Sequence, residues 1–218
     1  MASLTDDYAD DARKRMVDSQ LRPNKVTDPR ILTAMRTLPR ERFLPPALSA
    51  LAYSDQNVSL GGGRVLLQPM TLARLIQAME PLAGDKTLIV GAGTGYAAAV
   101  LAACGCTVTA LEESGPLLDL AKAAPTGATI VSGPLAAGWP AGAPYDLILI
   151  DGAVTEVPAA IAAQLKPETG RLVTILSQGL TSHAIKAEAT AAGISVRPLF
   201  DCLCPELPAF ARAPAFEF

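Results

Sequence analysis

The chain has 218 residues, of which 50% are hydrophobic and 18% charged, and its formal net charge is −3. A chain of this length can bury a large core, and it fits one domain with a modest extension. The slightly acidic balance argues against a nucleic-acid binder that depends on phosphate contacts. No apolar run reaches the roughly 18 residues of a membrane helix, and the acidic N-terminus lacks the apolar segment of a secretion signal. We therefore expect a cytoplasmic protein with no membrane partner.

Residues 1–82 are predicted to form a helical N-terminal region that packs with the rest as one compact unit. A helix is expected over Asp10–Leu21, and a second one starts at Asp28-Pro29, since Asp caps helices well and Pro suits their first position. A short helix over Leu48–Tyr53 and a longer one from Pro69 to Met79 follow. Alternating charges on the first helices are typical of solvated helix surfaces.

The segment Ser59–Arg64 contains three consecutive glycines, which favour neither helix nor strand. It is predicted to be a loop. Two interpretations stay open: a plain surface loop, or a mobile segment that closes over a ligand.

Residues 83–218 alternate between short apolar runs rich in β-branched residues and helix-forming stretches, which predicts a parallel sheet covered on both faces. The tail, residues 205–218, is rich in Pro and Phe and is expected to pack irregularly. The expected strands are 87–90, 108–111, 129–131, 145–151, 170–176, 185–189 and 195–200, and the expected helices 96–104, 117–123 and 157–165.

The first strand of this region leads into Gly91-Ala92-Gly93-Thr94-Gly95, after which a helix begins at Tyr96. Glycines let the backbone turn sharply and let a ligand come close, and the start of the helix points free N–H groups at the turn. The next strand ends on Glu112, which follows Gly91 by 21 positions. An acid about 20 residues after the glycine turn can accept hydrogen bonds from a ribose diol. Glu113 is the second candidate for that role.

The glycine spacing distinguishes between nucleosides. A dinucleotide fingerprint requires Gly-x-Gly-x-x-Gly or Ala, but Tyr96 occupies the sixth position here, which makes a nicotinamide-dependent oxidoreductase a remote alternative. Gly-x-Gly-x-Gly after a strand resembles motif I of class I S-adenosylmethionine-dependent methyltransferases. One departure from that motif is Ile89, where an acid usually stands.

A set of motifs between Met16 and Leu176 resembles the protein-L-isoaspartate O-methyltransferase family. Several of these motifs are not shared with methyltransferases at large. The whole set of similar motifs is Met16, Gln20-Leu21, Asp28, Ala34-Met35, Leu38-Pro39-Arg40-Glu41-Arg42-Phe43-Leu44-Pro45, Ala52-Tyr53-Ser54-Asp55, Gln68-Pro69, Val90 to Tyr96, Ala143-Pro144-Tyr145-Asp146, Val157-Pro158 and Gln164-Leu165-Lys166-Pro167.

The resemblance implies a Rossmann-like, doubly wound α/β sheet of seven strands, the last antiparallel. It also implies methyl transfer from S-adenosylmethionine to the free carboxylate of an isoaspartyl residue in damaged protein, by a monomer. The implied cofactor-binding residues are Gly91, Ala92, Gly93, Thr94, Gly95, Glu112, Gln68, Pro134 and Leu135.

The acceptor side departs from the family pattern. The family has Thr-Ile-Ser before Gln-Pro, with hydroxyls beside the acceptor carboxylate, whereas this chain has Val65-Leu66-Leu67. The family's Gly-Asp-Gly is Gly133-Pro134-Leu135. The acceptor-site candidates are therefore Val65, Leu67 and Asp151, with Asp151 at the carboxyl end of a strand, where it could act on a neutral hydroxyl or simply cap the strand.

Three functions remain open at this point: an isoaspartyl methyltransferase, a methyltransferase of the same ancestry with another, small acceptor, and a non-catalytic binding module. An ionised carboxylate needs no general base, so His183 is expected to be a surface residue. A buried carboxylate still needs hydrogen bonds, which the backbone of Gly61–Gly63 or Arg64 could supply. The pairs Cys104/Cys106 and Cys202/Cys204 are closer than zinc ligands usually are, so no metal is expected.

Overall fold

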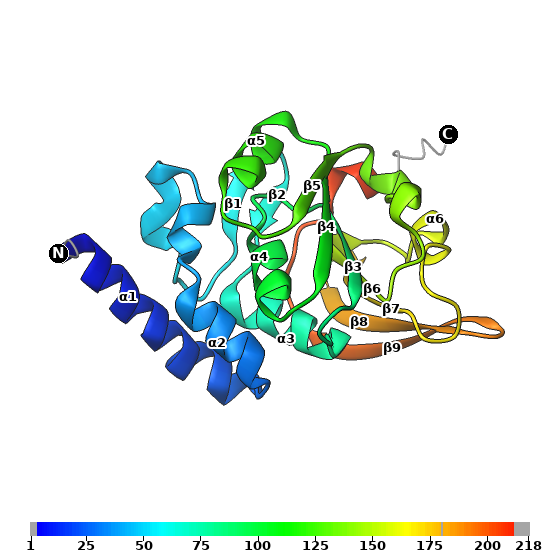
Figure 1. Ribbon diagram of the computed structural model, residues 1–218, viewed down its shortest axis with the longest axis horizontal. Coiled ribbons are helices and arrows are strands. Elements are labelled where there is room, and N and C mark those ends of the chain that lie inside the picture. The colour runs from blue at the N-terminus through cyan, green and yellow to red at the C-terminus, as the bar shows by residue number, and fades with distance from the viewer. Residues whose placement is uncertain (1–3, 180, 212–218) are drawn as a thin grey trace.

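The computed structural model describes residues 4–179 and 181–211. Its centre is a seven-stranded sheet in the order β5-β4-β3-β6-β7-β8-β9 (Figure 1). A separate two-stranded hairpin, β1-β2, lies beside it. The strands are β1 (Val58–Gly61), β2 (Arg64–Leu66), β3 (Lys86–Val90), β4 (Thr107–Glu112), β5 (Thr129–Ser132), β6 (Leu147–Val154), β7 (Arg171–Gln178), β8 (Thr181–Thr190) and β9 (Gly193–Asp201).

Five neighbouring strands of the sheet, β5 to β7 in spatial order, run parallel, which confirms the doubly wound architecture. The last strand, β9, pairs antiparallel with β8 and so runs in the same direction as β7, which corrects the prediction that the last strand opposes the others. Strand β8 also pairs antiparallel with β7, so β8 is the strand that runs against the others. The tight β7-β8 and β8-β9 connections explain this, because strands joined by short turns must be antiparallel.

The apolar strand runs are explained by burial on both faces of the sheet. Ile89 and Leu149 belong to one hydrophobic cluster, and their chain neighbours Leu88 and Ile148 to the other. Successive side chains of a strand point to opposite faces, so a strand covered on both sides needs no polar alternation.

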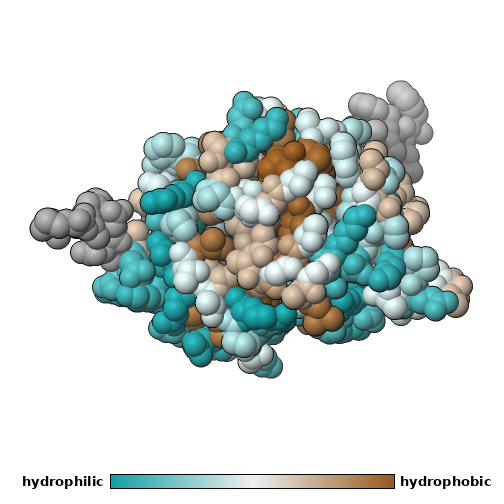
Figure 2. Space-filling view, viewed as in Figure 1, coloured by the Kyte–Doolittle hydropathy of each residue, from teal (hydrophilic) through white to brown (hydrophobic). Residues whose placement is uncertain are grey.

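The helices are α1 (Leu4–Met16), α2 (Pro29–Thr37), α3 (Pro69–Met79), α4 (Tyr96–Ala103), α5 (Gly115–Ala123) and α6 (Ala159–Ala162). The backbone N–H of Arg30 donates to the Asp28 carboxylate at 2.9 Å, which confirms the predicted cap of α2. Apolar residues of α2, α3 and α4 share one cluster with Ile89 and Leu149, so the N-terminal helices and this face of the sheet have a common core. Figure 2 shows hydrophilic side chains over α1 and α2, in line with their surface ion pairs.

Three predicted elements differ in the structure. Ser59–Arg64 is not a loop but most of a hairpin, whose turn is formed by Gly62 and Gly63 at positive φ. The first helix ends at Met16 and continues as a wider π-helical turn to Leu21. The helix expected over 157–165 is a single turn, α6.

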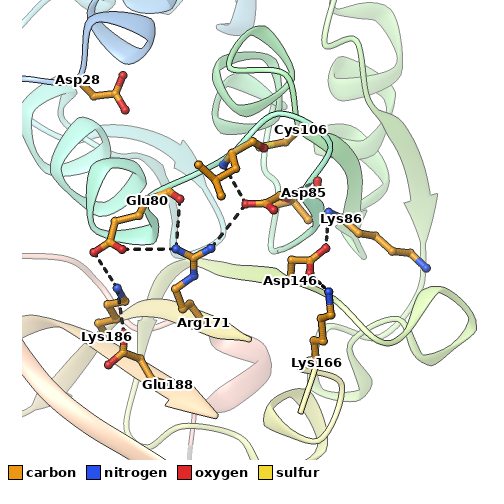
Figure 3. Close-up of polar contacts among 12 residues, drawn as sticks. Asp28, Glu80, Asp85, Lys86, Cys106, Asp146, Lys166, Arg171, Lys186 and Glu188 are labelled. Atoms are coloured by element: carbon orange, nitrogen blue, oxygen red, sulfur yellow. Dashed lines mark hydrogen bonds and ion pairs between the residues drawn. The ribbon is translucent and has the colours of Figure 1, made fainter. Parts of the chain in front are cut away.

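Charged residues hold the amino-terminal edge of the parallel strands (Figure 3). Arg171, at the start of β7, lies between the carboxylates of Glu80 and Asp85, at 3.5 and 3.6 Å. Lys186 pairs with Glu80 at 3.0 Å and with Glu188 at 3.1 Å. This edge is therefore occupied by the protein's own ion pairs, whereas ligands of doubly wound sheets bind at the carboxyl edge. No helix within the described ranges 4–179 and 181–211 is long and apolar enough to cross a membrane.

Substitution of Gly95 tests how closely the turn into α4 is packed. It and Gly84 both have φ of +89°, but a Cβ at Gly95 would lie 2.6 Å from the Thr126 methyl, while a Cβ at Gly84 meets nothing within 4 Å. We expect Gly84→Ala to cost about 1–2 kcal/mol of unfolding free energy from backbone strain. Gly95→Ala should cost about 1–3 kcal/mol more because of overpacking. Urea unfolding of both variants measures this, and equal losses would contradict the packing described for the turn.

Candidate functional site

The glycine turn joins β3 to α4 at the carboxyl edge of the sheet. Gly91, Gly93 and Gly95 all have positive φ, which L side chains rarely adopt. The backbone N–H groups of Gly91 and Ala92 both donate to the Leu111 carbonyl at 3.0 Å, which ties the turn to the end of β4. The turn is thus a fixed feature of the fold, with its glycines required by the backbone.

Glu112 closes β4, and its side chain is fully buried. Its Oε2 accepts a 2.7 Å hydrogen bond from the Gly93 N–H, and its Oε1 accepts bonds from the N–H groups of Glu113 and Ser114, both at 3.0 Å. These three backbone donors hold the carboxylate against the glycine turn. The predicted juxtaposition of acid and turn is therefore present.

Arg64 is the other partner of Glu112. Its Nη1 and Nη2 donate to the two Glu112 oxygens, each at 2.8 Å, in the parallel geometry that makes arginine–carboxylate pairs strong. Nη2 also donates to the Gly91 carbonyl at 2.8 Å. The Arg64 side chain is 8% exposed, so this ion pair is buried. The separation of 48 positions in the sequence explains why no local pattern indicated the pair.

Apolar side chains cover the turn beside Arg64. A Cβ on Gly91 would lie 3.4 Å from a Leu207 methyl and 3.6 Å from a Leu135 methyl. Leu207 also fills the space above Gly152, and its N–H donates to the Ala153 carbonyl at 2.8 Å. The segment after β9 therefore lies over the carboxyl edge of the sheet, which the sequence prediction of an irregular tail did not indicate.

A cavity of about 370 Å³ lies next to this covered turn, between the β1-β2 hairpin, called the glycine hairpin below, and the start of α5. Glu113 is exposed and lines the cavity, and its Oε2 accepts a 3.1 Å hydrogen bond from the Leu135 N–H. The cavity is lined by Leu60, Gly61, Gly62, Arg64, Glu113, Ser114, Pro116, Leu117 and Pro208. Of the two acids considered for a ribose, Glu113 faces this space, while Glu112 lies behind Arg64.

The donor and acceptor groups fit a nucleoside. If Arg64 moves away, Glu112 is still held by three backbone N–H groups. The places that Arg64 leaves on the carboxylate can then accept hydrogen bonds from a ribose diol. Gly91 and Gly93 would hold the chain close to the ligand, and Leu135 would contact it. Pro134 is exposed beside this region, and Gln68 caps α3 while its N–H donates to Asn57 at 2.8 Å. The cofactor roles of these residues remain predictions.

Asp151 lies beside the turn because Ile150 is in register with Val90, the residue before Gly91. The β6-β7 register shifts between Leu149 and Ala153, and such bulges re-aim side chains. Oδ1 of Asp151 is buried, and no hydrogen-bond donor of the described chain reaches it. Burial raises the pKa of Asp151 to about 7, against the lowering effect of Arg64 and Arg40, while Glu112 raises it.

The two apolar acceptor candidates differ in burial. Leu67 is only 1% exposed and belongs to the core, and its carbonyl accepts a hydrogen bond from the fully buried Arg40. Val65 is half-buried at the centre of β2, between Arg64 and Leu66. Neither side chain has a hydroxyl, so the hydroxyl groups of the family's Thr-Ile-Ser motif have no counterpart at these two positions of the fold.

The cysteines take no part in this arrangement. Burial raises the pKa of the Cys104 and Cys202 thiols to about 11 and that of Cys204 to about 12, so they stay protonated at neutral pH. Within the described residues, no three His, Cys, Asp or Glu side chains form a group able to hold a metal ion.

The sheet order, the reversed strand β8 and the glycine turn at the carboxyl edge define a Rossmann-like methyltransferase fold. Residues 11–193 match the family model described as protein-L-isoaspartate(D-aspartate) O-methyltransferase. The chain belongs to this family, as its motifs predicted.

Relatives agree with this family assignment, and a solved structure has the same fold. A protein-L-isoaspartate O-methyltransferase of Methylorubrum extorquens (strain PA1) is 46% identical over 167 residues, which cover 75% of this chain and 73% of the relative. One from Chromobacterium violaceum is 39% identical, over 84% and 83%. A Plasmodium falciparum beta-aspartate methyltransferase, crystallised with S-adenosyl-L-homocysteine, has a similar fold with a TM-score of 0.76 at 18% identity, over 90% of this chain and 98% of that one.

A pH-dependent stability test follows from Asp151. Its pKa is about 7 in the folded chain, above an ordinary aspartate value of about 4, so the folded state binds this proton more tightly. The group therefore lowers stability as pH rises from about 4 to 7. Asp151→Asn should be more stable relative to wild type at pH 8 than at pH 4, by roughly 2–4 kcal/mol. Urea unfolding at both pH values measures this, with the exposed Asp119→Asn as control; the same difference at both pH values would refute it.

Proposed function

We propose that the chain is an S-adenosylmethionine-dependent O-methyltransferase that methylates the free carboxylate of isoaspartyl residues in protein. The observation that carries the proposal is the family match over residues 11–193, together with the glycine turn and Glu112 at the carboxyl edge of the sheet. We further propose that it acts as a cytoplasmic monomer and has no nucleic-acid partner.

The chemistry asks little of the protein's acids and bases. An isoaspartyl carboxylate has a pKa of about 4 and is already ionised at neutral pH, so its oxygen needs no general base to act as the nucleophile. The bound cofactor supplies an electrophilic methyl group on a sulfonium. Transfer of that methyl to the carboxylate oxygen, with loss of its bond to sulfur, would give a methyl ester and a neutral thioether with no proton released.

The protein's contribution is orientation and the exclusion of water. Holding a nucleophile in line with its target removes much of the entropic barrier. Glu112, held in place by the Gly93 N–H, would fix the ribose end, and the glycine hairpin with Pro208 borders the cavity. A Cβ on Gly63 would lie 3.0 Å from Pro208, so the hairpin and the segment after β9 touch and together cover the site.

A second candidate is a methyltransferase of the same family that uses a neutral hydroxyl acceptor. Two features of the site favour it: the apolar Val65 and Leu67, and the carboxyl of Asp151 with a pKa of about 7. A neutral hydroxyl needs a base near its operating pH, and Asp151 has the right value for that role.

The proposal is tested by two measurements on the wild-type chain. Calorimetry with S-adenosylmethionine should show binding of one nucleoside per chain, and radiolabelled methyl should appear in an isoaspartyl peptide but not in the matched aspartyl peptide. Binding without a preference for the isoaspartyl peptide would reject this acceptor and favour the neutral one. No heat and no labelling would reject both enzyme readings in favour of a non-catalytic module.

A further inference from the structure

The buried pair of Arg64 and Glu112 uses the acid that a ribose would need. Glu112 accepts five hydrogen bonds, two of them from Arg64. A carboxylate has roughly four lone-pair sites, so these five donors already fill it, and a diol can bond only by taking the two places that Arg64 occupies. Nucleoside binding through Glu112 therefore requires Arg64 to leave.

Removal of Arg64 leaves Glu112 well supported. The backbone N–H groups of Gly93, Glu113 and Ser114 still donate to it. Arg64 has less support, since among the described residues its hydrogen bonds go to the Gly91 carbonyl and to Glu112 alone. A displaced guanidinium in this partly closed site needs a new anionic partner, because a buried charge without one is costly.

The local backbone allows Arg64 to move. It follows the hairpin turn, where an added Cβ on Gly61 or Gly62 has no neighbour within 4 Å and one on Gly63 meets only the Pro208 side chain among the described residues, at 3.0 Å. Arg64 already lines the cavity, and it is the only positively charged residue among the described residues that do so. The other buried arginine nearby, Arg40, is fully enclosed and bound to the carbonyls of Ala52 and Leu67.

The acceptor carboxylate lacks a partner from the positions that carry hydroxyls in the family motif. Val65 and Leu67 offer no donor, and Arg64 immediately precedes them in the chain. Arginine binds a carboxylate with two parallel hydrogen bonds, as it does with Glu112 here.

We propose that Arg64 exchanges partners during binding: it pairs with Glu112 in the free protein and with the acceptor's carboxylate once a nucleoside ribose has taken its place on Glu112. Arg64 is thus a specificity-determining residue that selects an anionic acceptor and couples acceptor binding to cofactor binding. This inference rests on the proposed function. It assigns to Arg64 the acceptor-binding role that the hydroxyls of the Thr-Ile-Ser motif have elsewhere in the family.

The test compares Arg64→Gln with wild type in two assays. Calorimetry with S-adenosylhomocysteine should show binding about tenfold tighter in the variant, because the nucleoside no longer competes with a buried ion pair. Methylation of an isoaspartyl peptide should show a KM for the peptide that is higher by about tenfold or more, because the carboxylate loses its charged partner. Arg74→Gln is the matched control, since Arg74 stacks on Phe200 away from Glu112, and it should leave both constants within about twofold of wild type.

Opposite shifts of the two constants distinguish partner exchange from a structural role, which would weaken both. Nucleoside affinity that is unchanged or weaker in Arg64→Gln, or an unchanged peptide KM, overturns the inference while wild-type activity leaves the proposed function standing. If wild type shows neither binding nor methylation, the proposed function itself fails. Arg64→Lys serves if the glutamine variant does not fold: it keeps the charge but cannot pair through two nitrogens, so it should tighten nucleoside binding with a smaller rise in peptide KM.

Discussion

The buried ion pair of Arg64 and Glu112 connects every part of the site. Glu112 ends β4, Arg64 starts β2, and the Gly91 carbonyl and Gly93 N–H join the same network at the turn after β3. Arg64 bridges the hairpin to both the acid and the turn, whereas Glu112 keeps its three backbone donors without Arg64. The hairpin, the glycine turn and the strand end are therefore positioned by one shared set of hydrogen bonds.

The sheet explains why this network lies where it does. At the amino edge, Arg171 and Lys186 form ion pairs with carboxylates of the protein itself (Figure 3). At the carboxyl edge, β3 leads into the glycine turn and β4 ends on Glu112, and cover comes from the hairpin and from Leu207. Segments that cover a site by a few side-chain contacts are less tightly held than core strands, so they can open for a ligand.

Much of the fold was predictable because its signals are local. The apolar runs of β3 and β6, the cap at Asp28 and the spacing from Gly91 to Glu112 all lie within short windows of sequence. The hairpin was not predicted, because three glycines have no strand propensity and the pairing of β1 with β2 depends on the surrounding core. A prediction that uses only the local sequence pattern therefore assigns such a segment to a loop.

The site shows the same division. The acid and the turn were placed together from spacing alone, whereas the Arg64 contact depends on a pairing across 48 residues that only the fold creates. Asp151 was predicted to end its strand, but β6 continues to Val154, and the neighbours of Asp151 follow from the Val90–Ile150 register and the bulge in β6. The cover by Leu207 follows from the path of the chain after β9, which composition did not indicate.

A crystal structure of the chain with S-adenosylhomocysteine tests the central claim most directly, because it shows what Glu112 binds when the nucleoside is present. The account predicts that the Glu112 oxygens lie about 2.5–3.0 Å from the ribose hydroxyls and that both Arg64 Nη atoms have left hydrogen-bond range of Glu112. A complex in which Arg64 keeps both bonds to Glu112 while other groups hold the ribose would contradict it.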